Sequence, residues 1–414
     1  MMKFIRKIYD KSAELILNEW TAAAALSLYM VIMHLEFSYF QYVDLFELIA
    51  KAVRYLLYLV MLVRMILIYV RNKEMPSVLM LGMFLLGIVI TVLRGDRGIV
   101  ILLLFVYGLK DIDFNKILNI VYHTHFAVFI SLVCASLLGI IPNWSIDNAN
   151  RLRYFLGYRF ATIPTTYFFI ILVLQMVVRR EKIKASELMM DTVIAVLLYS
   201  YTDSRTGMFL SMIVIACMLY LKLRNKLPVH QRIADFFMNN KVVRRILYAL
   251  CWLTPVMIYG IIILVIIKYN EGSAFAIKIN SVLSSRIYYS SRALSRYGVP
   301  LLGKNITWYG WGGYGYVSQP DFEYNYIDIS YLSILYNKGL IMLVLYMCMI
   351  SLGLEKTVKE NDFPMLAAMI LILMWAMIEP NLLAIEMNIF TIYIFRASEE
   401  KLHMSKRRTI YETV

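Results

Sequence analysis

The sequence predicts an all-α polytopic membrane protein of about twelve transmembrane helices, and three observations point to this class. Residues AVILMFWYC make up 61% of the 414-residue chain and charged residues only 17%, against about 45–50% and about 25% in ordinary soluble proteins. So few charges could not cover so much apolar side chain in water. The apolar residues also form long runs, which short basic segments separate. We expect residues 1–414 to form a single membrane domain.

Each predicted helix is a run of mostly apolar residues close to the length of about 20 that crosses a bilayer. The fourth, seventh, eighth and twelfth runs are short. The chain starts with a basic segment before the first run, as a signal peptide does, but this run is long and lacks an obvious small-residue cleavage site. We therefore expect a retained signal-anchor. The predicted spans cover residues 20–38, 52–70, 76–93, 98–109, 118–141, 161–178, 188–202, 207–221, 246–267, 327–353, 363–379 and 383–395.

Lysine and arginine predict how these spans are oriented. With the N-terminus in the cytoplasm, 26 of the 42 Lys and Arg residues fall in inner segments and 12 in outer segments, and four lie within spans or at their edges. This excess follows the positive-inside rule and leaves both termini in the cytoplasm. The net charge of +14 is then mostly a topology signal and an attraction to anionic lipid. No nucleic-acid partner is expected.

Metal and nucleotide chemistry are not expected. The four cysteines stand singly in apolar runs, and the five histidines lack the HExxH spacing of a metal site. The inner segments contain no GxxxxGK[ST] phosphate-binding motif, which argues against an ATP-driven pump and against an enzyme of cytoplasmic nucleotide-sugars. Two outer loops, 142–160 and 268–326, are larger than a turn, and long loops are usually functional. We expect chemistry without metal or cofactor on the outer face, on a substrate that arrives already activated.

The second outer loop contains three regularly spaced arginines. A helix along the outer surface is expected over 276–297, and at about 100° per residue Arg286, Arg292 and Arg296 fall within an arc of about 120°. Such a stripe suits a polyanion such as pyrophosphate, which arginine binds through two parallel hydrogen bonds. A solvated helix face, or contacts with lipid phosphates, fits the same spacing.

The turn at 201–207 joins the short seventh and eighth spans. Fifteen residues at about 1.5 Å each cover about 22 Å, less than the hydrocarbon core of about 30 Å, so the turn is expected to lie below the outer surface. Arg205 would then occupy a protected, low-dielectric position, where a charge is costly and often functional. An ion pair with Asp203 is the alternative.

Residues 303–326 are rich in Gly, Trp and Tyr. Aromatic faces stack on the apolar faces of sugars, but Trp and Tyr also populate membrane interfaces by default. Asp328 follows at the outer start of the tenth span. It is either a helix N-cap or a general base that faces the loop.

The order of these features resembles the bacterial O-antigen and capsular polysaccharide polymerases, often called Wzy-type, and the related O-antigen ligases. The resemblance covers roughly residues 150–345. The matching pieces are SerArgThrGly at 204–207, SerArg and ProLeuLeuGlyLys within 285–304, and IleAsp, TyrLeu and GlyLeuIle within 327–341.

The third piece separates the two groups of enzymes. In the ligases a His-polar pair precedes a glycine by eleven positions, whereas here Asp328 stands at the His position and Gly339 follows eleven residues later. Ile329 replaces the polar residue, and Met342 stands where a small or hydroxyl residue is expected. The capsular polymerases often have Asp at this position, so the resemblance favours a polymerase.

The resemblance implies a GT-C-like glycosyltransferase of the bacterial cytoplasmic membrane that needs no metal. Such enzymes join oligosaccharide repeat units, linked to undecaprenyl pyrophosphate, into capsular or O-antigen polysaccharide on the outer face. Asp328 would take the proton of the acceptor hydroxyl, and Arg205 and Arg286 would hold the pyrophosphate. The further candidates for substrate binding are Arg159, Arg292, Arg296, Lys304, Trp311 and Tyr326.

The expected partners are the lipid-linked oligosaccharides, membrane lipid and other polysaccharide-assembly proteins, such as a flippase and a chain-length regulator. Two alternatives stay open. One is an O-antigen-type or teichoic-type ligase. The other is a polysaccharide-lipid flippase or transporter, although transporters usually show duplicated halves with broken helices at corresponding positions, and we find neither in the sequence.

Overall fold

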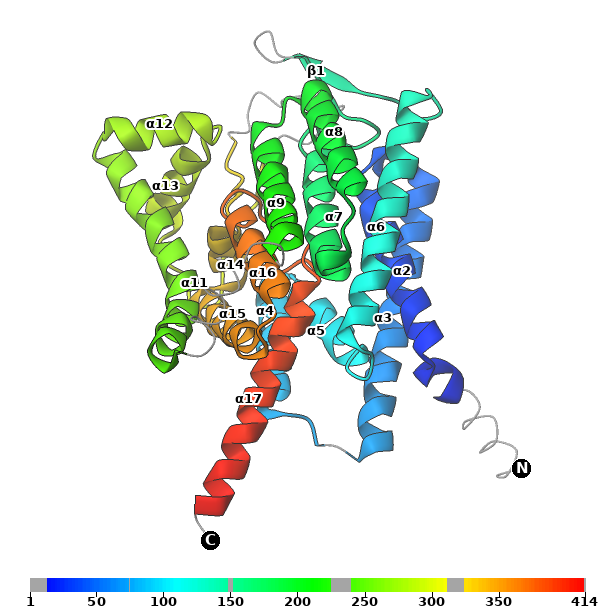
Figure 1. The fold of residues 1–414 in the computed structure, drawn as a ribbon, viewed down its shortest axis with the longest axis vertical. Helices are drawn as coiled ribbons and strands as arrows, with labels where there is room; N and C mark the ends of the chain where they lie inside the picture. The colour runs from blue at the N-terminus through cyan, green and yellow to red at the C-terminus, as the bar shows by residue number, and fades with distance from the viewer. Residues whose placement is uncertain (1–12, 74, 148–151, 225–239, 311–323, 413–414) are drawn as a thin grey trace. The chain divides into compact units, whose positions relative to one another are not determined.

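The computed structural model describes residues 13–73, 75–147, 152–224, 240–310 and 324–412, and its regular structure is almost entirely helical (Figure 1). This agrees with the predicted all-α class. The number of twelve spans and their orientation stay predictions. Six helices within the described ranges are long and apolar enough to cross a membrane, namely α3 (Asp44–Asn72), α6 (Phe114–Leu137), α7 with η2 (Ile163–Lys182), α9 (Arg205–Leu223), α11 (Lys241–Asn270) and α15 (Leu340–Glu360).

The chain divides into two compact units, residues 1–84 with 100–219 and residues 85–99 with 220–414. The remaining elements are short or less apolar. They are α2 (Glu19–Glu36), η1 (Tyr39–Tyr42), α4 (Val78–Arg94), α5 (Gly98–Gly108), the antiparallel pair β1 (Ser145–Asp147) and β2 (Leu152–Tyr154), α8 (Ala185–Thr202), α12 (Ala274–Val282), α13 (Arg286–Tyr297), α14 (Ser330–Lys338), α16 (Phe363–Trp375) and α17 (Phe390–Glu412).

In the first unit, α6 packs against both α2 and α7, and the contact encloses a small polar cluster. The imidazole of His34 stacks on the ring of Tyr167 with 3.5 Å between ring centroids. Its Nε2 lies 2.7 Å from the hydroxyl of Tyr158, and its Nδ1 lies 3.4 Å from Nδ1 of His125. All four side chains are fully buried. Polar groups enclosed in this way specify one arrangement of the helices, because a different packing would break their hydrogen bonds.

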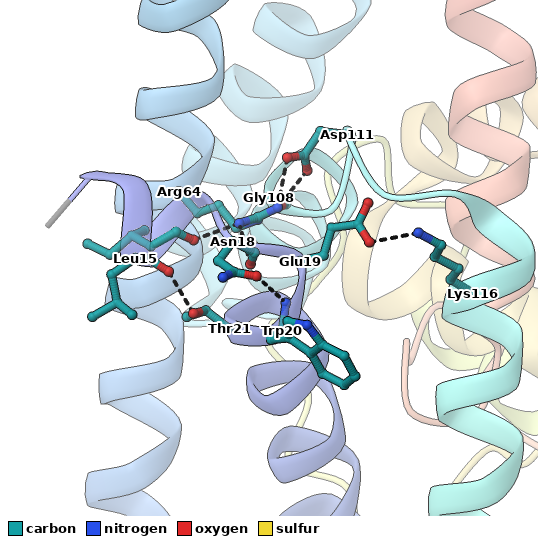
Figure 2. Close-up of polar contacts among 10 residues, drawn as sticks. Leu15, Asn18, Glu19, Trp20, Thr21, Arg64, Gly108, Asp111 and Lys116 are labelled. Carbon is teal, nitrogen blue, oxygen red and sulfur yellow. Dashed lines mark hydrogen bonds and ion pairs between the residues drawn. The ribbon is translucent and has the colours of Figure 1, made fainter. Parts of the chain in front are cut away.

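A fully buried arginine joins three segments of the same unit (Figure 2). Arg64, on α3, donates from Nε to the carbonyl oxygen of Gly108 at 2.7 Å and from Nη1 to that of Ile16 at 2.6 Å. Its Nη2 donates to both carboxylate oxygens of Asp111 at 2.8 Å. The planar guanidinium thus ties the start of α2 and the end of α5 to α3. A charge inside an apolar helix is tolerated because all three of its nitrogens have acceptors.

In the second unit, α15 is the central helix and packs against α11, α14, α16 and α17. The predicted tenth span, 327–353, is wrong as a single helix, because α14 ends at Lys338 and α15 starts at Leu340. Gly339 between them has φ +95°, and a Cβ there would overlap the carbonyl of Leu301. The backbone of residues 300–304 packs against this break. Leu340 donates its N–H to Pro300 O at 2.9 Å, and Lys304 donates its N–H to Tyr336 O at 2.7 Å.

The twelfth predicted span also differs from the structure, whereas the fourth, 98–109, coincides with a short helix. The twelfth, 383–395, is helical only from Phe390, and 376–389 forms turns. Pro380 lies within this stretch and disfavours helical conformation in the residue before it. The fourth is α5, whose eleven residues cover only about 16 Å of a bilayer core of about 30 Å. Neither segment supplies a full transmembrane helix within the described residues.

Candidate functional site

The arginine-rich segment of the predicted second outer loop forms two helices, so the prediction of one helix over 276–297 is wrong. Helix α12 ends at Val282 and α13 starts at Arg286. Between them Ser284 and Ser285 have φ +52° and +67°, the left-handed conformation that stops a right-handed helix. Arg286 therefore occupies the first turn of a new helix.

Arg286 contacts two carboxylates from segments far away in the sequence. Its Nε donates to Oδ2 of Asp328 at 3.3 Å, and its Nη2 lies 3.7 Å from Oε1 of Glu379. The side chain of Arg286 is only 12% exposed, and those of Asp328 and Glu379 are 27% and 19% exposed. The structure thus brings together Arg286 and Asp328, two of the three predicted catalytic residues, and adds a third ionisable group, Glu379.

A buried serine holds the two carboxylates next to each other. Ser330 lies two residues after Asp328, and its hydroxyl donates to the carbonyl of Glu379 and accepts the N–H of Leu382 at 3.1 Å. Its own N–H donates to the carbonyl of Ala376 at 2.9 Å. Three hydrogen bonds therefore link the segment that presents Asp328 to the loop that presents Glu379, so that both carboxylates keep fixed positions around Arg286.

Burial dominates the ionisation of this cluster. It raises the pKa of the Asp328 carboxyl, and the nearby Arg286 guanidinium opposes the rise. It also raises the pKa of Glu379 to about 7, which Arg286 opposes and the negative charge of Asp328 reinforces. One guanidinium with two carboxylates has a net charge of −1 when both are ionised. Glu379 is the group that takes a proton near neutral pH.

Asp328 is not a helix cap. Helix α14 starts at Ser330, its N-cap position is Ile329, and no side-chain hydrogen bond caps it. Of the two interpretations of Asp328 that the sequence left open, the cap is therefore wrong. Its carboxylate is free of helix-capping contacts and faces a guanidinium.

Residues 307–309 and 324–325 of the predicted second outer loop lie side by side next to this cluster. Asn325 accepts the N–H of Tyr309 at 2.6 Å and donates to the carbonyl of Thr307 at 3.0 Å. The ring of Tyr324 packs on that of Tyr289 with centroids 4.3 Å apart. Electrostatic repulsion from Asp328 adds to burial in raising the pKa of the Tyr324 hydroxyl. Residues 307–309 and 324–325 thus hold each other close to Asp328.

Two more of the predicted binding residues meet at one aromatic ring. The guanidinium of Arg296 and the ammonium of Lys304 each lie 5.6 Å from the centroid of Tyr297. Trp308 lies edge-on to the same ring, and its indole N–H donates to Asn337 at 2.8 Å. Arg296 and Lys304 are exposed, whereas Arg292 is half-buried and Arg286 is nearly buried. All three arginines belong to α13, as the predicted stripe requires, but their surroundings differ, since Arg286 is nearly buried beside two carboxylates and Arg296 is exposed.

Arg205, the third predicted catalytic residue, belongs to the first unit. The preceding helix α8 and its own helix α9 have 18 and 19 residues, about 27–28 Å each, longer than the sequence indicated. The side chain of Arg205 is 71% exposed, and its Nε lies 3.9 Å from Oδ1 of Asp203. The expected protected position is not found, and the ion pair with Asp203 is present. The turn itself is firmly placed, because Thr165 on α7 donates its hydroxyl to Ser204 at 2.9 Å.

The remaining candidates are Arg159, Tyr326 and Trp311. Arg159, also in the first unit, donates to Gln41 at 2.7 Å and lies over the ring of Phe37 at 4.6 Å. Tyr326 lies against Gly310, where an added Cβ would be 3.3 Å from the tyrosine. Trp311 lies outside the described residues. No group of three potential metal ligands occurs among the residues that the structure describes.

Glu379 is the site residue that the sequence analysis missed. It stands at the end of the predicted eleventh span, in the segment MetIleGluProAsn. An acidic residue directly before a proline at the end of an apolar run was the available signal, since an acidic group near a span is rare and often functional. Comparisons with protein-family models, curated proteins and solved structures found no match for this chain.

Proposed function

We propose that the protein is a polysaccharide polymerase, a metal-independent glycosyltransferase that joins oligosaccharide repeat units linked to undecaprenyl pyrophosphate. The reaction takes place on the outer face of the bacterial cytoplasmic membrane. The observation that supports this most is the contact between Arg286 and Asp328. These residues belong to two separate pieces of the family resemblance, are 42 positions apart, and meet in a largely buried ion pair.

The pair has the chemical groups that the transfer requires. The acceptor hydroxyl oxygen attacks the anomeric carbon of the donor chain, the bond from that carbon to the pyrophosphate oxygen breaks, and the electron pair leaves with undecaprenyl pyrophosphate. The hydroxyl proton passes to the carboxylate of Asp328. General base catalysis of this kind contributes about 10²–10⁴-fold, and attack opposite the leaving group inverts the anomeric centre.

Arg286 can bind the pyrophosphate leaving group and stabilise its charge. Its contacts with Asp328 and Glu379 involve Nε and Nη2, which leaves Nη1 for a phosphate oxygen. A guanidinium that meets the charge developing on the leaving oxygen lowers the barrier. Pyrophosphate also competes with Asp328 for Arg286. Loosening of that ion pair would make Asp328 a stronger base when the donor is bound.

The surroundings of Tyr297 suit a saccharide. Tyr297 and Trp308 present aromatic surface, and Arg296 and Lys304 lie at the same ring. Aromatic faces cover the apolar face of a sugar, and the exposed cations can bind hydroxyl or carboxylate groups of the repeat unit. Arg205, Arg159 and Arg292 stay proposals as further phosphate or saccharide contacts.

Deletion of the gene in the parent bacterium, followed by analysis of lipid-linked glycans, tests this function. A polymerase predicts accumulation of single repeat units on undecaprenyl pyrophosphate and loss of long chains. Chains of normal length retained on the lipid would indicate a ligase instead. Lipid-linked repeat units confined to the inner face would indicate a flippase.

A further inference from the structure

Arg286 lies between two carboxylates although a single one would balance its charge. Asp328 approaches Nε and Glu379 approaches Nη2. The second carboxylate is costly at a site for an anion, because with both acids ionised the cluster is negative before any phosphate arrives. The hydrogen bonds of Ser330 to the loop of Glu379 nevertheless keep it there. Charge balance of Arg286 therefore does not account for Glu379.

We propose that Glu379 is a positioning residue that holds Arg286 through Nη2 and couples binding of the lipid pyrophosphate to uptake of one proton. When Nε of Arg286 turns from Asp328 to a phosphate oxygen, Glu379 is the contact that keeps the guanidinium in place. Its protonation removes the negative charge that would repel the phosphate. This inference rests on the proposed function.

The charged groups around Glu379 define the direction of the pH effect. They are Arg286 on α13 and Asp328 before α14, and Tyr324 interacts in turn with Asp328. Below pH about 7 Glu379 is protonated, so that Arg286 and Asp328 balance each other. Above that pH the cluster has a net charge of −1. An anionic ligand favours the protonated form, so its affinity is full below the pKa of Glu379 and falls as the pH rises through it.

The test is the binding of undecaprenyl pyrophosphoryl N-acetylglucosamine to the purified full chain in nanodiscs at several pH values. Each phosphate of this probe has one ester bond and one anhydride bond, and its single acidic group stays ionised between pH about 6 and 9, so the ligand does not titrate. For the wild-type protein we expect Kd to rise about tenfold between pH about 6.5 and 8.5, since one linked proton changes Kd by at most about tenfold per pH unit. Glu379→Gln, which keeps an oxygen near Nη2 without the charge, should bind tightly and equally at both pH values.

Glu271→Gln is the matched control. Glu271 is an exposed carboxylate of the same unit, ion-paired with Lys268 at 2.7 Å, and its neutralisation should leave the wild-type pH response intact. An unchanged pH response in Glu379→Gln, or the same flattening in Glu271→Gln, would overturn the inference while the polymerase proposal stands. Absence of probe binding by the wild-type protein at every pH would contradict the polymerase proposal itself.

Calorimetry on the wild-type protein gives a second test that needs no variant to fold. Binding at pH about 7.5 should take up protons, so the measured heat should change with the ionisation enthalpy of the buffer. Heat that is independent of the buffer, or proton release, would overturn the inference.

Discussion

Asp328 is held by Arg286, whose Nε lies 3.3 Å from its Oδ2, and not by the start of a helix. This relationship changes how a substitution at Asp328 is interpreted. A cap would lose helix stability, whereas a carboxylate beside a guanidinium loses charge and a proton acceptor.

Asp328→Asn should therefore abolish most activity without unfolding the protein. Asparagine keeps an oxygen that can accept the hydrogen bond from Arg286 but cannot take the proton of the acceptor hydroxyl. We expect turnover to fall about 10²-fold or more, measured as polymer formed from lipid-linked repeat units, with normal membrane insertion. Asp328→Ala should also lose the contact with Arg286. A normal rate for the Asn variant would exclude Asp328 as the base.

Arg286→Lys should lose most of the polymer, because a point charge cannot reach Asp328, Glu379 and a phosphate as the planar guanidinium does. Arg205→Lys should do the same if Arg205 binds pyrophosphate. Arg179→Lys is the control, since Arg179 also pairs with a carboxylate, Glu187 at 2.6 Å. Chain length on gels after expression in a deletion strain measures all three. Normal polymer from both Arg286→Lys and Arg205→Lys would indicate that these residues have structural or lipid-contact roles instead.

Gly339→Ala should destabilise the second unit. Its φ of +95° and ψ of 166° cost an ordinary residue about 1–3 kcal/mol, and the added methyl group meets the backbone of Leu301 and Gly303. We expect a lower midpoint of thermal unfolding in detergent. Gly260→Ala, in the interior of α11 with no atom within 4 Å of the added Cβ, should instead stabilise by about 0.5–1 kcal/mol. Equal midpoints for the two variants would disprove the close approach at Gly339.

Arg64→Lys should lower thermal stability, because lysine cannot serve Gly108, Ile16 and Asp111 together (Figure 2). Each lost hydrogen bond that involves a charged group costs about 1.5–3 kcal/mol. Arg54→Lys, at a partly exposed ion pair with Glu36, should cost less than about 1 kcal/mol. Unfolding midpoints of the two purified variants provide the comparison, and a stable Arg64→Lys protein would show that the three segments are held by other contacts.

Reporter fusions test the orientation that the charges predict. Fusions after residues 184, 230 and 358 should report the cytoplasm, and fusions after 150 and 300 should report the outside. The reason is the excess of Lys and Arg in the expected inner segments. A cytoplasmic signal at 300 would place Arg286 on the wrong face for lipid-linked repeat units and would falsify the proposed function.

The sequence by itself was enough to predict a helical membrane protein and the approximate position of most helices. Long apolar runs form helices at membrane depth because only a helix satisfies its backbone hydrogen bonds within one segment. The runs at 52–70 and 246–267 accordingly lie within α3 and α11, and most of the run at 118–141 lies within α6. Arg286 and Asp328 were also identifiable, because charged residues beside apolar runs are conspicuous and their order resembles a known family.

Only the tertiary structure decided which of these side chains meet. The left-handed backbone at Ser284 and Ser285 ends α12 and starts a new helix at Arg286. The backbone of Leu301 and Gly303 packs so closely on residue 339 that only glycine fits there. Glu379 is far from Arg286 in the chain and joins it through the hydrogen bonds of Ser330. Local periodicity reports which residues favour a helix, whereas these contacts depend on the packing of distant segments, which no local pattern encodes.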